Sequence, residues 1–375
     1  MLKRFSHLLQ AVFSILLAAL CGVLLIRSGT VREGVRAGLV TSAEVIIPSL
    51  YLFMAVSGAI AESRAGDLLS RPFGPLTRRF LKLPACMGSV LILSMVGGYP
   101  IGAKSIAVLL ERKRISREDA GRALCFCCNA GPSFVVTAVG TQMLGSTRAG
   151  VTLLAAHLAA SLLIGVLLSL RLPVPPKEKA PAEGLPFSEA FIRGVNGATA
   201  GILAICSYVV VFSALGALLR GSGLAALLAG RSETAGVLLI GLLEVTTGCL
   251  QAAALPGKLP LILIPLFISF AGFSIFFQIR ATLQPYRLRY GRFLLCRVLH
   301  ALLTLLFSYP LLQPVYPAVA AFQSAVPPVS YHTPNTPLVT LLLLGVSAMA
   351  LWSLGLPAPQ RIDQKEENGS RRKKG

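Results

Sequence analysis

The stretch "MVGGYPIGAK", Met95–Lys104, lies within the apolar segment 85–110 and places three glycines, a proline and a lysine where a membrane helix would be continuous. Relative to alanine, glycine costs about 1 kcal/mol and proline about 3 kcal/mol in a helix interior. A lysine at the bilayer centre costs about 2.5–3.5 kcal/mol. Non-helical backbone at that depth is tolerated only inside protein or beside a water-filled cavity. The stretch therefore predicts an interrupted membrane helix that lines a polar cavity.

The composition of the whole chain is typical of a membrane protein. Of its 375 residues, 54% are hydrophobic and only 13% are charged, whereas soluble domains carry about 25% charged residues. Its net charge is +20, but the basic residues cluster in short loops beside apolar segments, as in cytoplasmic loops. The pattern does not favour a nucleic-acid partner. We expect one multi-pass domain in the cell membrane, with both termini in the cytoplasm.

The expected fold class is an all-α polytopic membrane protein, with about eight transmembrane helices plus two re-entrant hairpins in an inverted repeat. Apolar segments of roughly 20 residues, enough to cross a bilayer, recur along the chain. The candidate full spans are 8–26, 42–62, 118–144, 149–170, 197–219, 259–283, 293–312 and 337–355. The candidate hairpins, 85–110 and 234–256, are each broken near the middle.

The spans and hairpins form two halves with the same order of elements, starting from opposite faces of the membrane. Each half consists of a span, a hairpin, a broken span and a further span. Inverted repeats with discontinuous helices are the architecture of secondary transporters, which bind their solute where the helices break. The expected divisions are an N-terminal transmembrane helix and external loop (1–41), the first repeat (42–170), a proline-rich and charged cytoplasmic linker (171–196), the second repeat (197–312), an external loop and last transmembrane helix (313–355), and a basic cytoplasmic tail (356–375).

Interruptions fall at matching places in the two halves. The first half contains "GGYPIGAK" (Gly97–Lys104) and "CCNAGPSF" (Cys127–Phe134), and the second contains "LEVTTGCLQ" (Leu243–Gln251) and "SFAGFSIFFQIR" (Ser269–Arg280). The N-terminus of a half-helix favours an anion, and its C-terminus offers carbonyl groups to a cation. Interruptions that meet at mid-depth would form a polar chamber. The residues expected to break the helices are Gly97, Gly98, Pro100, Gly102, Gly131, Pro132, Gly248 and Gly272.

Polar side chains beside the interruptions are candidate ligands for a solute. Charged residues inside a membrane are rare and usually functional. Lys104 and Arg280 are expected to attract an anion, and Glu244 is expected to bind a coupling proton or cation. The expected solute-binding residues are Tyr99, Lys104, Asn129, Ser133, Thr246, Thr247, Gln251, Ser274, Gln278 and Arg280.

Several of these residues have a structural alternative. Glu244 could pair with Lys104 or Arg280 as a tie across the two halves. Arg280 could extend to the cytoplasmic interface, and Tyr99 with Pro100 could form a simple kink. Serine and threonine in membrane helices commonly pack one helix against another.

Other polar residues within apolar segments are assigned no role in binding. Arg122 and Arg297 lie near expected cytoplasmic ends of spans, and we interpret them as extending to the interface. His157 and His300 stand alone on apolar faces and are interpreted as packing residues.

The sequence contains no pattern typical of an enzyme or a metal centre. No Ser/His/Asp set or carboxylate pair occurs within the spans. The stretch "GGYPIGAKS" nearly matches a phosphate-binding loop, but Ala103 intrudes before Lys104 and no strand precedes it. The eight cysteines lie in or beside apolar segments, and the C-x-x-C spacing of Cys125 and Cys128 has no second cluster. We expect no enzymatic activity, no metal and no cofactor.

Five stretches carry a resemblance to a known family. "SGAIAES", "GGYPIGAK", "CNAGPSFVVTAVG", "GLLEVTTG" and "SFAGFSIFFQ" resemble the sporulation integral membrane protein YlbJ family across about Thr41–Pro310. That family belongs to the nucleoside-recognition (Gate) domain proteins, which are similar in layout to concentrative nucleoside transporters. This chain departs in its brief cytoplasmic segment between Ser63 and Leu83 and in its short basic tail, neither of which touches these motifs.

The resemblance implies a role in endospore formation, in the outer forespore membrane. It also implies movement of dipicolinic acid, a small aromatic dicarboxylate, toward the developing spore. A dianion agrees with the cationic residues and half-helix N-termini noted above. The aromatic residues that could stack on its ring are Tyr99, Phe134, Phe273 and Phe277.

Three functional hypotheses follow. The first is a secondary transporter for a small organic anion, with dipicolinic acid as the solute. The second is a nucleoside transporter in which Glu244, Asn129 and Gln278 bind the ribose and base. The third is a non-transporting membrane assembly factor for spore maturation. The expected partners are the small-molecule solute and the lipid bilayer, and relatives of the Gate type suggest a homo-oligomer.

Overall fold

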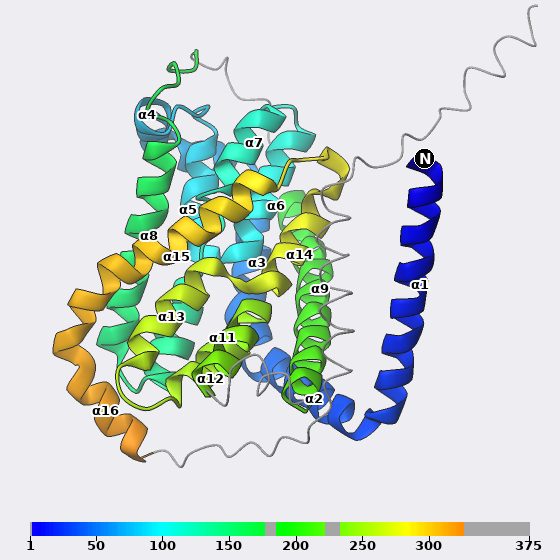
Figure 1. The fold of residues 1–375 in the computed structure, drawn as a ribbon. Coiled ribbons are helices and arrows are strands. Elements are labelled where there is room, and N and C mark those ends of the chain that lie inside the picture. The colour runs from blue at the N-terminus through cyan, green and yellow to red at the C-terminus, as the bar shows by residue number, and fades with distance from the viewer. Residues whose placement is uncertain (1, 177–184, 222–232, 326–375) are drawn as a thin grey trace, which may run out of the picture. The chain divides into compact units, whose positions relative to one another are not determined.

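The computed structural model describes residues 2–176, 185–221 and 233–325, and helices account for nearly all of them (Figure 1). In hydrocarbon, an apolar segment must satisfy its own backbone hydrogen bonds, which a helix does. Within the described ranges no strand forms, and Ser63 with Leu185 makes an isolated bridge. The all-α class is therefore confirmed. The predicted last span, 337–355, and the tail, 356–375, lie outside the described residues.

The chain divides into two units, of which the second, residues 28–335, contains all the candidate site residues. The described helix of the first unit is α1 (Leu2–Ile26). The first half of the second unit contains α2 (Ser28–Thr41), the π-helical turn η1 (Ser42–Ile46), α3 (Ile47–Glu62), α4 (Arg64–Phe80), α5 (Met87–Gly97), α6 (Tyr99–Glu111), α7 (Arg117–Leu124), the π-helix η2 (Ser133–Met143) and α8 (Thr147–Leu167). Its second half contains α9 (Phe187–Gly221), α11 (Glu233–Leu243), α12 (Val245–Ala253), α13 (Leu259–Phe270), α14 (Gly272–Leu283), η3 (Gln284–Tyr286), α15 (Gly291–Leu312), η4 (Gln313–Val315) and α16 (Tyr316–Ala325).

Among the described residues, 4 helical stretches are long and apolar enough to cross a membrane. They are Thr147–Leu167, Phe187–Gly221, Leu259–Tyr286 and Gly291–Ala320, and the segments Ser14–Ile26 and Ser28–Ile46 together form a further candidate. These stretches support a polytopic membrane protein. The predicted span 42–62 is a shorter apolar helix preceded by a π-helical turn, and the predicted span 118–144 is split into α7 and η2.

Two segments expected to be external loops are helical in the described residues. Residues 28–41 form α2, and residues 313–325 form η4 and α16. Residues 64–80, in the segment expected to be cytoplasmic, form α4. The predicted linker also ends earlier than expected, because α9 already begins at Phe187. A short polar segment beside an apolar span can thus be an amphipathic helix, as α4 is, and the Ser63 side chain caps it by accepting from the Ala65 amide.

Small residues allow the helices of the second unit to approach closely. A Cβ placed on Gly58 of α3 would lie 3.2 Å from the Cα of Gly194 on α9, and one placed on Gly34 of α2 would lie 2.6 Å from the Cα of Ala214 on α9. Helices in membranes commonly associate through such residues, because lipid supplies little hydrophobic driving force between them. The long helix α9 is thereby held against both α2 and α3.

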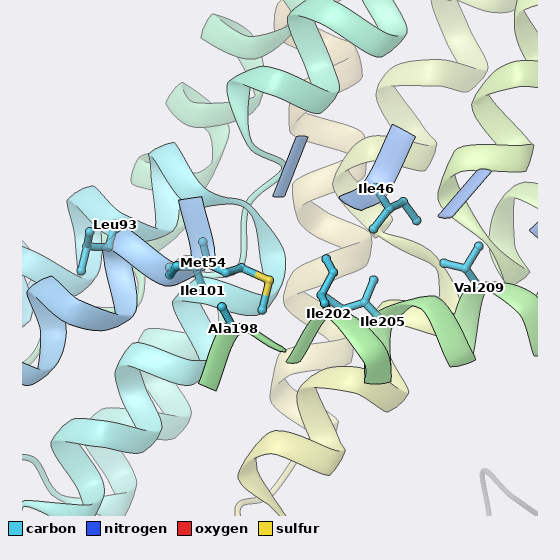
Figure 2. Packing of buried hydrophobic residues seen from close by; sticks show 9 residues of the cluster. Ile46, Met54, Leu93, Ile101, Ala198, Ile202, Ile205 and Val209 are labelled. Atoms are coloured by element: carbon cyan, nitrogen blue, oxygen red, sulfur yellow. The ribbon is translucent and has the colours of Figure 1, made fainter. Parts of the chain in front are cut away.

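The core beside the first hairpin is apolar (Figure 2). Met54 of α3 and Ile101 of α6 meet Ile202 of α9, and other apolar residues of α5 and α9 complete the cluster. This packing fixes the hairpin formed by α5 and α6 against α3 and α9. The cavity described below opens beside this cluster, since Ile46, Ile205 and Val209 belong to both.

Candidate functional site

The first interruption occurs at Gly98, between α5 and α6. Gly98 has φ 87° and ψ −180°, a conformation that suits glycine and strains other residues. Beyond the turn, a Cβ on Gly102 of α6 would lie 3.1 Å from the Cβ of Ser94 on α5. The two half-helices therefore fold back on each other as a hairpin. No side chain caps the N-terminus of α6. Pro100 carries no N–H and the Ile101 amide donates to the Gly98 carbonyl at 3.2 Å, so the Tyr99 amide is the donor of this first turn that a ligand could use.

The second interruption occurs at Glu244, between α11 and α12. Glu244 has the extended conformation and its carboxylate accepts from the backbone amides of Thr246, at 2.9 Å, and Thr247, at 2.6 Å. This is an N-cap, which satisfies two amides that the helix itself leaves unpaired. A Cβ on Gly248 would lie 2.2 Å from the Cα of Gly241, so this pair of half-helices is also a hairpin.

Within the described residues, Glu244 does not form an ion pair with a cationic side chain, which was the structural alternative for this residue. In the described part of the chain, no lysine or arginine pairs with the Glu244 carboxylate, which is 2% exposed. The carboxylate instead accepts hydrogen bonds from the backbone amides at the N-terminus of α12. The positive end of that half-helix is thus already complemented by the protein's own carboxylate.

The remaining interruptions lie in the two broken spans. Residues 125–132 separate α7 from η2, and Ala271, with φ 74°, separates α13 from α14. Gly131 lies close to the first hairpin, since a Cβ on it would be 3.1 Å from the Gly98 nitrogen. Gly272 lies close to the second, because a Cβ on it would be 3.2 Å from the Leu243 oxygen. Each hairpin tip therefore meets a broken span.

A cavity lies where the two hairpin tips come together. Its volume is ≈ 50 Å³, enough for a few water molecules, each of which needs roughly 10–15 Å³ by the same measure. Apolar residues of η1, α3 and α9 line one side. The predicted residues that line the cavity are Gly98, Tyr99, Pro100, Gly131, Phe134, Glu244, Thr246 and Gln278.

Gln278 is the polar residue in this cavity that is left without partners. Its side chain is 5% exposed, and neither its Nε2 nor its Oε1 has a hydrogen-bond partner. A buried amide without partners costs about 1–3 kcal/mol for each group, so such groups usually have a water or a ligand to bind. Tyr99 differs, because its hydroxyl donates to the Ile268 carbonyl at the end of α13.

The two cationic residues predicted to bind an anion lie outside this cavity. Lys104 lines a separate space of ≈ 20 Å³ with Glu62 and Arg193, and its Nζ has no hydrogen-bond partner. It points toward α9, since a Cβ on Gly197 would lie 2.4 Å from Nζ. The guanidinium of Arg280 lies 5.9 Å from the centre of the Tyr290 ring. Both residues follow the interruptions in sequence but face other parts of the fold.

Several further predicted residues surround the cavity without lining it. The Asn129 amide donates to the Phe126 carbonyl at 2.9 Å, and the hydroxyl of Ser274 is buried without a partner. Other predicted residues that do not line the cavity are Gly97, Gly102, Pro132, Ser133, Thr247, Gly248, Gln251 and Gly272. Most of these belong to the turns and helix ends that shape the cavity.

Arg297 does not extend to an interface, contrary to the interpretation from the sequence. Its side chain is 2% exposed, and its Nε donates to the Ser269 carbonyl at 2.8 Å. Its Nη1 donates to the Cys128 carbonyl. Arg297 thus connects the two broken spans. No local pattern predicts this role, because Ser269 and Cys128 are distant in the sequence.

His157 and His300 are also not isolated packing residues. Their rings stack with centres 4.5 Å apart, and His300 Nε2 lies 2.9 Å from the His157 carbonyl oxygen. His157 accepts from the Ala130 amide at 3.0 Å and contacts the Ser269 hydroxyl at 2.8 Å. The two histidines therefore belong to the same polar network as Arg297.

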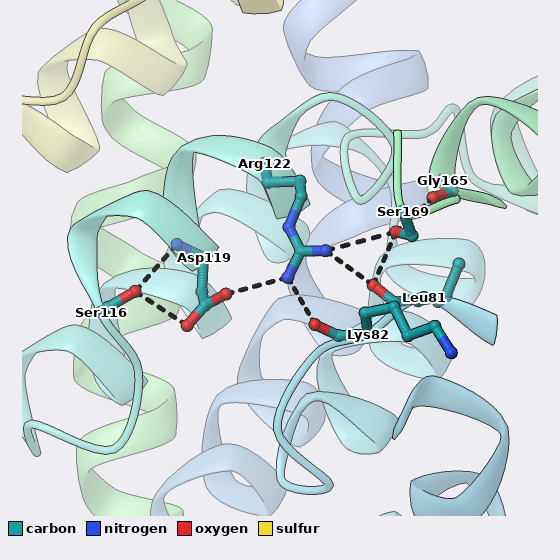
Figure 3. A network of polar contacts seen from close by, with 7 residues as sticks. All are labelled: Leu81, Lys82, Ser116, Asp119, Arg122, Gly165 and Ser169. Carbon is teal, nitrogen blue, oxygen red and sulfur yellow. Dashed lines mark hydrogen bonds and ion pairs between the residues drawn. The ribbon is translucent and has the colours of Figure 1, made fainter. Parts of the chain in front are cut away.

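Arg122 likewise lies inside the protein and organises a polar network (Figure 3). It donates to the carbonyls of Leu81 at 2.9 Å and Lys82 at 2.6 Å, and pairs with Asp119 at 2.9 Å. The Ser169 hydroxyl also donates to the Leu81 carbonyl, at 2.7 Å. Arg122 therefore holds the turn after α4 against α7.

We expect Arg122→Ala to lower the free energy of unfolding by about 1–3 kcal/mol. The substitution leaves the Lys82 carbonyl without this donor, while Ser169 still serves Leu81. Thermal unfolding in detergent measures the change. Arg117→Ala, at the exposed start of α7, is the control. Equal stability of the two variants would contradict the structural role of Arg122.

The helical fold, its candidate spans and its interruptions define a polytopic membrane protein with a largely apolar cavity that Glu244, Thr246 and Gln278 also line. The chain is 25% identical over 320 residues to the sporulation integral membrane protein YlbJ of Bacillus subtilis (strain 168), covering 76% of this chain and 78% of the relative. This similarity supports a relationship to the YlbJ family and agrees with the motifs quoted above. No family model and no solved structure matches the chain.

Proposed function

We propose that this protein is a secondary transporter of a small organic solute that acts in endospore formation. The observation that carries the proposal is the cavity at the two hairpin tips, where Glu244 and the unpaired amide of Gln278 meet uncapped backbone. Discontinuous helices around a buried polar site are characteristic of secondary transporters. A purely structural core would leave few polar groups unpaired.

The proposed transport mechanism uses the two halves of the chain as an inverted repeat. Residues 42–170 and 197–312 each contribute one hairpin and one broken span to the region of the cavity. Rocking of one half against the other would expose the cavity to each side of the membrane in turn. Since ≈ 50 Å³ is less than an aromatic solute occupies, the cavity must widen before it binds its solute.

We propose dipicolinic acid as the solute, on the basis of the family resemblance. The N-terminus of α6, with the uncapped Tyr99 amide and the positive end of the half-helix dipole, lies beside the cavity, which favours a carboxylate. The Gln278 amide supplies a further donor, and the rings of Tyr99 and Phe134 line the same space. No lysine or arginine lines it among the described residues, so the half-helix end replaces the cations expected from the sequence.

Glu244 is the proposed coupling residue. A dianion and a carboxylate repel each other in a cavity of low dielectric constant. Binding of a proton to Glu244 removes this repulsion, so that solute and proton would bind together. Transport of the anion would then be driven by a proton gradient.

A nucleoside is the second candidate solute. Its neutral sugar and base suit a cavity that is lined by a carboxylate and an amide and, in the described chain, by no basic side chain. Glu244 could accept from ribose hydroxyls, and Gln278 could both donate to and accept from a base. This candidate requires no anion site.

Uptake into proteoliposomes tests the proposed function. The full chain is reconstituted, and accumulation of labelled dipicolinic acid and of labelled uridine is measured separately, with and without a pH gradient and with each unlabelled compound as competitor. Saturable uptake of dipicolinic acid, blocked by the unlabelled acid, supports the first solute. Saturable uptake of uridine but not of dipicolinic acid supports the second. Absence of uptake of either compound contradicts both.

Gln278→Leu is expected to raise the KM for the solute about tenfold or more. Hydrogen bonds to charged groups contribute about 1.5–3 kcal/mol, and each 1.4 kcal/mol is about a factor of ten in affinity. Gln251→Leu is the matched control, because Gln251 is buried in α12 but does not line the cavity. Equal KM values for both variants would remove Gln278 from the binding site.

We further propose that the protein lies in the outer forespore membrane with both termini in the cytoplasm. The basic residues that flank the spans support this orientation through the positive-inside rule. Accessibility of cysteines introduced on opposite sides of one span, in a chain with its eight native cysteines replaced, measures the orientation directly.

A further inference from the structure

The carbonyl groups at the C-terminal end of α13 accept hydrogen bonds from three different parts of the chain. The last carbonyl groups of a helix have no partner within it. Here the Phe267 carbonyl accepts from the Ala271 amide at 2.8 Å, the Ile268 carbonyl accepts from the Tyr99 hydroxyl, and the Ser269 carbonyl accepts from Arg297. Three carbonyl groups at the negative end of this half-helix are therefore engaged by the protein.

Carbonyl groups at the interruption of the first broken span also accept hydrogen bonds from other parts of the protein. The Phe126 carbonyl accepts from the Asn129 amide at 2.9 Å and from the Ser161 hydroxyl at 2.6 Å. The Cys128 carbonyl accepts from the same Arg297 that bonds to Ser269. One guanidinium, carried by α15, thus lies between the carbonyl ends at both interrupted spans.

The charge of Arg297 is not balanced by a carboxylate. Its Nη2 donates to His300 Nδ1, so this histidine is neutral and its Nε2–H donates to the His157 carbonyl. His157 Nε2 accepts from the Ala130 amide, which places its proton on Nδ1, toward Ser269. No acidic side chain among the described residues pairs with Arg297. Carbonyl dipoles, the neutral His300 ring and the Phe293 ring, whose centre lies 5.9 Å from the guanidinium carbon, surround this buried cation.

Carbonyl ends of interrupted helices are the groups that coordinate Na⁺ in secondary transporters. We propose that Arg297 is a built-in cation that occupies the place of such an ion, so that this protein binds no Na⁺ there and transports its solute independently of Na⁺. The inference deepens the proposed transport function. It leaves Glu244, at the tip of the hairpin formed by α11 and α12, as the residue through which an ion gradient can act.

Ion binding and thermal unfolding of the purified full chain test the inference without any solute. For the wild-type protein we expect no saturable binding of ²²Na⁺ and the same Tm in NaCl as in choline chloride. Arg297→Ala is expected to lower the Tm, and millimolar Na⁺ or guanidinium, but not choline, should restore part of the loss. The same variant should acquire saturable ²²Na⁺ binding, because the carbonyl groups then lack their cation.

Two further variants keep the test decisive. Arg297→Lys retains a cation and is expected to fold without Na⁺, which covers the case in which the alanine variant does not fold. Arg122→Ala removes another buried arginine that bonds to carbonyls, and is expected to lose stability without gaining Na⁺ binding. Saturable Na⁺ binding by the wild-type protein, or a folded Arg297→Ala protein that responds to neither ion, would overturn the proposal. Because no uptake is measured, these outcomes are separate from failure of the transport function.

Discussion

Glu244→Gln is expected to abolish accumulation of solute driven by a pH gradient, while exchange of solute across the membrane continues. The glutamine side chain keeps one oxygen to accept from the amides of Thr246 or Thr247, so the start of α12 remains capped. It cannot take up and release a proton. The variant should therefore bind solute but lose the link between its movement and the gradient. Accumulation and counterflow in the same proteoliposomes measure the two activities separately.

The matched control for this prediction is Glu233→Gln. Glu233 begins α11 in the same hairpin, but it is exposed and does not line the cavity. The same change of charge there should leave accumulation unchanged. If Glu244→Gln accumulates solute as well as the wild-type protein does, Glu244 is not the coupling residue, and its carboxylate serves only as a helix cap.

Gly102→Ala is expected to prevent stable folding of the first hairpin. The added methyl would lie 1.7 Å from the Cys127 carbonyl oxygen, a backbone atom of the interrupted span. Overpacking a well-packed site typically costs about 1–3 kcal/mol and can cost more. Because the atom that the methyl would meet belongs to the backbone, no side chain can move aside to relieve the contact. We expect a loss of at least about 3 kcal/mol, seen as aggregation on size exclusion and a lower Tm in detergent.

Gly121→Ala provides the comparison. Gly121 lies within α7, and a Cβ placed on it would meet no atom within 4 Å. Alanine is favoured over glycine in a helix by about 1 kcal/mol, so this variant should be at least as stable as the wild type. A Gly102→Ala protein of normal stability would mean that α6 and the Cys127 turn are farther apart than described.

The positions of the helix interruptions follow from local sequence. Gly98 can adopt a positive φ at little cost, and Pro100 suits the first turn of the helix that follows. Glu244 can cap the amides two and three residues beyond it. Both effects act within a few residues, so the pattern of residues is sufficient to predict them.

The faces onto which the flanking residues point could not be predicted in this way. Lys104 is only a few residues from Tyr99, yet Tyr99 lines the cavity at the hairpin tips and Lys104 lines a different space toward α9. The difference depends on the rotation of α6 against α3 and α9, which the packing around Ile101 and Met54 fixes. The position of Lys104 beside the helix interruption therefore predicted a buried ammonium group, but not the cavity that this group lines.

The contacts of Arg297 could not be predicted from the sequence either, because they join residues that are far apart in the chain. Its guanidinium meets the Ser269 carbonyl 28 positions away and the Cys128 carbonyl 169 positions away. Near the end of an apolar segment, an arginine resembles one that reaches an interface. Only the approach of α15 to both broken spans turns it into their common hydrogen-bond donor.

The chain's residues alone were enough to establish a helical membrane protein whose spans break at defined glycines, prolines and a glutamate. The length of an apolar segment and the backbone preference of a residue are local properties, because each depends only on consecutive residues. The composition of the cavity, with Gln278 inside it and Lys104 and Arg280 outside, came from the way distant helices pack. Packing depends on contacts between residues far apart in sequence, and these set the direction in which each polar side chain points.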